Sequence, residues 1–128
     1  MAESAAPVTE EDVLAFVRAG IGSVWELELL LLLYRSSERR WSALEIEREL
    51  RASPTVVGSA LRHLRAAEVT AEPERDRFQY AAGSPRTDRI VRAIDHAYRT
   101  NPISVIKTIL GAPDATLKIF SDAFRLKD

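Results

Sequence analysis

The 128-residue chain contains no cysteine, and this absence excludes disulfide bonds and thiolate metal sites. Its most apolar segment, residues 29–33, is far shorter than the about 20 apolar residues that a membrane-spanning helix needs. Residues 1–9 lack the basic start and apolar run that are typical of a secretory signal. We therefore expect a cytoplasmic protein without a membrane partner.

The chain also lacks a basic excess, since 18 Lys and Arg face 19 Asp and Glu and the net charge is −1. Residues 1–35 carry two basic and six acidic side chains, residues 36–81 carry eight of each, and residues 82–128 carry eight basic and five acidic. Proteins that bind DNA strongly usually carry more cations, because phosphate contacts supply most of the affinity. The balanced middle segment is the main observation against DNA binding.

Motifs for catalysis are missing as well. The sequence has no glycine-rich phosphate loop, no nucleophile elbow and no favourably spaced set of serine, histidine and carboxylate. Its two histidines, His63 and His96, stand apart from any cluster of metal ligands. We expect no enzymatic activity, no cofactor and no metal site.

The sequence does contain a succession of helix signals. After an expected disordered tail at residues 1–8, Thr9 is placed to cap a helix that ends near Gly20. Ser23 and Glu26 have the spacing of a capping box at the start of the next helix. That helix is apolar on nearly all sides, which predicts that it lies at the centre of the core.

Two short helices joined by a turn follow. Trp41 is expected on a short strand or extended residue, and Ser42 with Glu45 forms a second predicted capping box. Ser53 is placed to cap the next helix, in which Pro54 takes the first position. The residues expected to clamp the two helices together are Ile46, Leu50, Val57, Leu61 and Leu64.

After Glu68 the apolar period changes from helical to alternating. Residues 69–72 and 77–80 alternate between apolar and polar side chains, and residues 73–76 separate them as a polar turn. Two such runs around a turn predict a β-hairpin.

Residues 87–128 are expected to form C-terminal helices. Thr87 is placed to cap the first, Asn101 and Pro102 begin the second, and Asp114 caps a last one. The last helix would carry Leu117, Phe120 and Phe124.

The first helix and these C-terminal helices together supply more apolar surface than one small domain covers, which predicts a homodimer through the terminal helices. The alternative is that the terminal helices wrap their own domain.

The stretch from Trp41 to Val69, WSALEIERELRASPTVVGSALRHLRAAEV, resembles bacterial regulators of the MarR-like winged helix-turn-helix families. In those families a capped helix, a short turn and a second helix ending in Leu-x-x-Leu lead into the wing. The resemblance covers residues 23–81 well and residues 87–110 loosely. It implies a mainly α fold with a small β-hairpin (α+β), as one domain at 9–128 around a winged-helix core at 23–81.

The resemblance also implies a dimeric transcriptional regulator that binds double-stranded DNA. The helix that begins at Pro54 would lie in the major groove, and the wing would contact the DNA backbone or the minor groove. The candidate DNA-binding residues are Thr55, Ser59, Arg62 and His63 on the helix, and Arg75 and Arg77 on the wing.

Two departures from the family pattern weigh against DNA binding. Glu68 stands where these families usually have glycine, so the end of the second helix is expected to differ in shape. Three glutamates on the first paired helix, Glu45, Glu47 and Glu49, would repel phosphates if they faced DNA. The arginines of the second helix and the wing are also open to local ion pairs with Glu68, Glu72, Glu74 and Asp76. These arginines are Arg62, Arg65, Arg75 and Arg77.

The balanced charge and these glutamates favour a second hypothesis, in which the winged helix is a protein-interaction module that does not bind DNA. A third hypothesis is a regulator that senses a small molecule in a pocket beneath Trp25, Trp41 and Tyr98. The two tryptophans are otherwise expected in the core.

Overall fold

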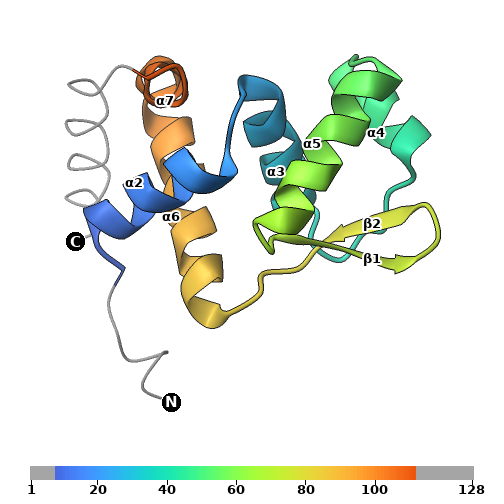
Figure 1. Ribbon diagram of the computed structural model, residues 1–128, viewed down its shortest axis with the longest axis horizontal. Coiled ribbons are helices and arrows are strands. Elements are labelled where there is room, and N and C mark those ends of the chain that lie inside the picture. Colours follow the sequence, from blue (N-terminus) through green and yellow to red (C-terminus); the bar gives the residue numbers. More distant parts are fainter. Residues whose placement is uncertain (1–7, 112–128) are drawn as a thin grey trace. The chain divides into compact units, whose positions relative to one another are not determined.

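A computed structural model describes residues 8–111, and within them the protein is mainly helical with one antiparallel hairpin. The predicted α+β class is confirmed (Figure 1). The predicted helix with Asp114, Leu117, Phe120 and Phe124, and residues 1–7 of the expected tail, lie outside the described residues. In chain order the elements are α2 (Glu10–Gly20), α3 (Val24–Arg35), α4 (Ala43–Leu50), α5 (Pro54–Ala66), β1 (Thr70–Glu74), β2 (Arg77–Tyr80), α6 (Pro85–Thr100) and α7 (Pro102–Ile109).

The chain divides into two compact units, of which one is Ser23–Gly83 and the other combines Met1–Gly22 with Ser84–Asp128. In the Ser23–Gly83 unit, α3 is the central helix and packs against α4, α5 and β2, as its apolar composition predicts. Ser23 caps it by accepting a hydrogen bond from the Glu26 N–H. Its fully buried side chains are Leu27, Leu29, Leu30, Leu31 and Leu33.

The pair α4 and α5 forms as predicted. Both hydrogen bonds of the Ser42–Glu45 capping box are present at the start of α4. Arg51 ends α4 in the left-handed conformation with φ 56°, and the Ser53 hydroxyl then accepts a hydrogen bond from the Val56 N–H to cap α5. The residues predicted to clamp the pair are buried with one exception, since Leu50 is only half-buried. The buried residues on the inward side are Ile46, Val57, Ala60, Leu61 and Leu64.

The end of α5 is a Schellman motif with Glu68 in its left-handed position, at φ 62°. The Val69 N–H donates to the Leu64 carbonyl at 3.2 Å, and the Glu68 N–H donates to the Arg65 carbonyl at 3.0 Å. Leu64 and Val69, which flank the turn, are both fully buried. The expected change of shape at Glu68 is therefore absent, because glutamate here takes the conformation that glycine adopts most readily.

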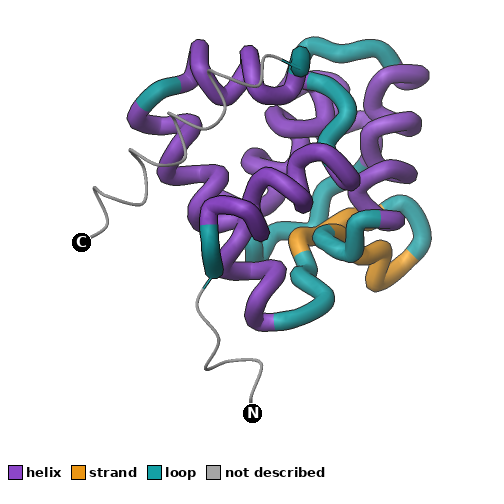
Figure 2. Tube along the Cα trace, turned by 60° about the vertical axis from the view of Figure 1, so that its left-hand side comes forward, coloured by secondary structure: helices purple, strands orange, loops and turns teal. Residues whose placement is uncertain are grey.

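The first strand of the hairpin begins one residue later and ends two residues later than the sequence predicts, and Figure 2 shows the two paired strands. Residues 73 and 74 belong to β1 rather than to the turn, since Glu74 pairs with Arg77, and the turn consists of Arg75 and Asp76. The register is irregular between Ala71 and Glu74, so Pro73 is tolerated although it has no N–H to donate. Trp41 is extended as predicted and forms an isolated bridge with Phe78.

The other unit contains α2, α6 and α7, and it departs from prediction at one helix start. The N-cap of α6 is Ser84, whose hydroxyl accepts a hydrogen bond from the Thr87 N–H, rather than Thr87 itself. Pro85 then takes the first helical position, where its missing N–H costs nothing. Thr9 and Asp12 form a capping box that begins α2. No helix in residues 8–111 is long and apolar enough to cross a bilayer.

Candidate functional site

The exposed side of α5 carries the four helical residues that the sequence predicts for DNA contact. Thr55, Arg62 and His63 are exposed and Ser59 is half-buried. Positions 55, 59 and 62 recur at helical spacing and so share one side of the helix. The opposite side holds the buried stripe that packs on α3 and α4, so this exposed side is available to a partner.

Arg62 and Arg65 differ in their surroundings. Arg65 Nη1 lies 3.4 Å from Glu72 Oε1 on β1, whereas no ion pair joins Arg62 to another residue in the described range 8–111. The Nη1 atom of Arg62 lies 3.7 Å from the position that a Cβ on Gly58 would occupy. Among residues 8–111, no acidic side chain therefore neutralises Arg62, and its guanidinium lies beside the backbone of its own helix.

His63 has a partner that the sequence did not predict. Its Nδ1 lies 2.6 Å from Oε2 of Glu26, a buried residue in the first turn of α3. The His63 side chain is 59% exposed and the Glu26 side chain only 7%. A buried carboxylate thus holds one ring nitrogen of His63, which fixes the orientation of the imidazole.

The two arginines predicted on the wing are in different environments. Arg75 lies in the turn, exposed, and forms no ion pair with any residue in the part of the chain that the structure describes. Arg77 Nη1 lies 3.8 Å from Glu45 Oε1, so its charge is directed toward the start of α4. Arg65 therefore forms one of the predicted local ion pairs, with Glu72. The partner of Arg77 is instead Glu45, a distant residue that the sequence did not suggest for it.

Glu45 connects three segments of this unit. The hydrogen bond from the Ser42 backbone N–H is the main reason that the pKa of its carboxyl lies below the ordinary value of 4.5. The charges of Arg39 and Arg77 lower the pKa further, while partial desolvation opposes them. Glu45 is consequently engaged by neighbours and contributes less repulsion toward an anion than a free carboxylate.

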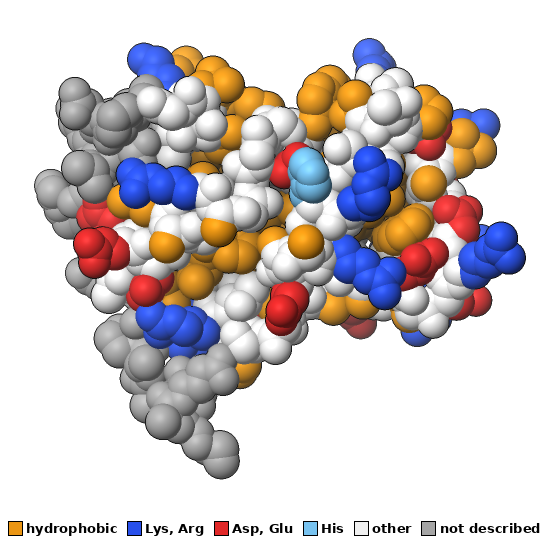
Figure 3. Space-filling view, viewed as in Figure 1, with side chains coloured by type: hydrophobic (Ala, Val, Ile, Leu, Met, Phe, Trp, Pro, Cys, Tyr) orange, Lys and Arg blue, Asp and Glu red, His pale blue; other side chains and the backbone are white. Residues whose placement is uncertain are grey.

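One hydrogen bond joins the hairpin to the start of α4, and two further contacts hold the hairpin in place. Asp76 Oδ1 accepts a hydrogen bond from the Ala43 N–H at 3.3 Å, and the Asp76 N–H donates to Glu72 Oε2 at 2.9 Å. Arg40 lies 3.4 Å from Glu74. The hairpin is thereby held in a defined position, with Arg75 in its turn. On the face that Figure 3 shows, acidic and basic side chains are interspersed over α5 and the hairpin.

The tryptophans have different positions. Trp41 is 3% exposed, donates its indole N–H to Ser36 Oγ at 3.1 Å and stacks under the Arg39 guanidinium at 3.5 Å. It lies in the core as predicted. Trp25 is 43% exposed, so the same prediction is wrong there. Its place near the start of α3 leaves the ring outside the leucine core.

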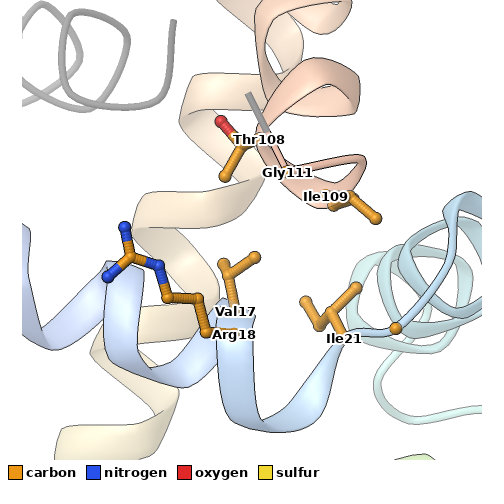
Figure 4. Close-up of a pocket in the computed structure, with 7 residues that line it drawn as sticks. Val17, Arg18, Ile21, Thr108, Ile109 and Gly111 are labelled. Atoms are coloured by element: carbon orange, nitrogen blue, oxygen red, sulfur yellow. The ribbon is translucent and has the colours of Figure 1, made fainter. Parts of the chain in front are cut away.

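A pocket of about 430 Å³ lies in the other unit, between α2 and α7 (Figure 4). Neither tryptophan lines it, and neither does Tyr98, so it gives no support to the predicted sensing pocket. Arg18 is the charged member of a lining that otherwise combines three aliphatic residues with two glycines and a threonine. The lining residues are Val17, Arg18, Ile21, Gly22, Thr108, Ile109 and Gly111.

No protein-family model matches the chain, and comparison with curated sequences and with solved structures yields no match either. Within residues 8–111, no group of three or more histidine, aspartate or glutamate side chains is placed to hold a metal ion.

Proposed function

We propose that the Ser23–Gly83 unit is a winged helix that binds double-stranded DNA, and that the protein is a cytoplasmic transcriptional regulator of the MarR-like type. One observation carries the proposal. On the exposed side of α5 and in the hairpin turn, Arg62 and Arg75 have no acidic partner among the described residues, although acidic side chains are as frequent as basic ones around them. An anionic partner would compensate both charges.

In this proposal α5 enters the major groove, which is wide enough for one helix. Thr55 and Ser59 are small enough to let the helix come close, and Arg62 reaches a base edge or a phosphate. Arg75 contacts the DNA backbone or the minor groove from the hairpin turn. His63 presents its second ring nitrogen, and Arg77 supports the hairpin through Glu45.

A homodimer through the terminal helices completes the proposal. Two α5 helices would then meet successive major grooves, which are about 34 Å apart. The other unit offers a surface for this contact, because Ile103 and Leu110 on and just after α7 are 66% and 73% exposed. They lie two helical turns apart and so share one side of the helix.

The test is a polarisation titration on random-sequence duplex DNA at two salt concentrations. We expect Arg62→Ala to weaken binding about tenfold. Arg75→Ala should make the slope of log K against log salt concentration less steep by about one unit, because one fewer counterion is released on binding. Arg65→Ala is the matched control, because Glu72 already neutralises that exposed arginine of α5, and it should change affinity less. Unchanged binding in both test variants rejects the proposed surface.

A second candidate function is a protein-interaction module without DNA binding. The ion pairs that Glu45 and Glu72 form with Arg77 and Arg65 favour it, because they neutralise cations that a DNA-binding surface would use. Recovery of a stoichiometric protein partner, with no retention of the protein on heparin or DNA, would select this function over the first.

A further inference from the structure

Gly58 lies in the interior of α5, where glycine weakens a helix relative to alanine. Its backbone conformation does not require glycine, because Gly58 does not have a positive φ angle. Among the glycines in residues 8–111, Gly111 is the one with a positive φ. Packing does not require it either. A Cβ built at position 58 would meet only Arg62 Nη1 within 4 Å, at an ordinary contact distance of 3.7 Å.

Two other glycines show what a local requirement looks like. A Cβ on Gly83 would lie 2.7 Å from Glu68 Oε1 and 3.1 Å from the Glu68 Cβ, so space is limited there. Gly111 has φ 91°, a conformation that other residues rarely adopt. Neither reason applies to Gly58, so the described part of the chain does not account for this glycine.

The surroundings of Gly58 indicate which kind of binding partner would require a glycine at this position. The exposed Thr55 and the half-buried Ser59 are small, so the backbone of α5 lies near the surface at this point. Side chains on a helix lean toward its N-terminus, and Arg62 accordingly places its guanidinium beside Gly58. That guanidinium has no acidic partner within residues 8–111, which favours an anionic partner over a neutral one.

We propose that Gly58 is the point of closest approach between α5 and double-stranded DNA. This inference rests on the proposed function and identifies the backbone position of α5 that lies nearest to the DNA. The sugar–phosphate wall of the major groove packs against the Cα of Gly58, and the Arg62 guanidinium donates hydrogen bonds beside it. A methyl group at position 58 keeps the two backbones apart.

The experiment compares the full-length wild type with Gly58→Ala in thermal unfolding and in duplex titration. We expect opposite effects. Alanine raises the Tm by about 4 °C, because it favours the helix and its Cβ fits. It also weakens duplex binding at least about tenfold, because it opens the closest contact. A variant that is more stable and binds less well cannot be explained by misfolding.

A second pair of variants separates direct approach from an effect through Arg62. In the Arg62→Ala background, Gly58→Ala should still weaken duplex binding. No further loss in that background means that Gly58 only accommodates Arg62, which overturns the inference. A lower Tm for Gly58→Ala overturns it too, because glycine is then needed for the fold. Equal affinity of Gly58→Ala and wild type rejects this inference alone, whereas a wild type that binds no duplex rejects the proposed function with it.

Discussion

Glu26 stands at the start of α3 with only 5% of its surface exposed, and its carboxylate lies 2.6 Å from His63 Nδ1. A charged group that is buried to this degree requires hydrogen-bond partners, because it has lost its water. His63 supplies one of them from the exposed side of α5. The residue that the sequence suggests for DNA contact therefore also ties α5 to α3, and the tie orients its imidazole.

We expect His63→Ala to lower the free energy of unfolding by about 1–3 kcal/mol, because it removes a hydrogen bond to a buried charged group. His63→Asn should recover part of the loss, since its side-chain amide can place a donor near the former Nδ1. Urea unfolding of both variants at neutral pH measures the effect. Equal stability of His63→Ala and wild type would show that the contact contributes nothing.

At the scale of the elements, the junction between the hairpin and α4 depends on charge. Glu45 accepts the Ser42 N–H and faces Arg39 and Arg77, and its pKa is lowered below 4.5 chiefly by the Ser42 hydrogen bond. A carboxyl whose pKa is lower in the folded protein stabilises the fold above the pKa of the unfolded chain. This contribution is lost as the pH falls through the lowered folded value.

Glu45→Gln tests this junction, because glutamine keeps a capping oxygen and removes the charge. We expect the variant to have a lower Tm than the wild type at pH 7, where the carboxylate is ionised in both the folded and unfolded states. The difference should shrink as the pH drops below 4.5, because the wild-type side chain then becomes neutral. A Tm difference that stays constant from pH 7 to pH 3 contradicts the assignment.

At the scale of the whole molecule, local signals in the sequence predict the helix starts well. Thr9, Ser23, Ser42 and Ser53 all cap the helices expected from them, because a cap depends on residues only three positions away. The error at Thr87 has the same local origin, since Ser84 also fits the pattern and Pro85 favours the earlier start.

Features that depend on distant segments were not predictable from the sequence. Nothing near Glu26 in the chain points to His63, and nothing near Asp76 points to the Ala43 N–H that it binds. The sequence places the hairpin turn at residues 73–76 instead of 75–76 for a related reason. Pro73 is a strong turn signal by itself, but the pairing of Glu74 with Arg77 places it inside β1. Local propensity is overridden here by pairing across the hairpin.

Assembly is also a property of the whole molecule, and the exposed side of α7 offers its test. Ile103 and Leu110 are large apolar side chains that the described part of the protein leaves uncovered. Burial of such a side chain contributes about 1.5–3 kcal/mol, so the loss of two would weaken a dimer by at least about a hundredfold. We therefore expect the wild type to be dimeric at tens of micromolar and Ile103→Ser/Leu110→Ser to be monomeric.

Sedimentation equilibrium measures both proteins, and circular dichroism checks that the double variant retains its helices. The exposed Thr55 on α5 provides a matched control, because Thr55→Ala alters the other unit and should leave the dimer intact. A wild type that sediments only as a monomer at tens of micromolar removes the dimer from the proposal. If the double variant remains dimeric, the interface does not lie on this side of α7. Two serines in a buried apolar contact would remove most of the free energy that stabilises the dimer.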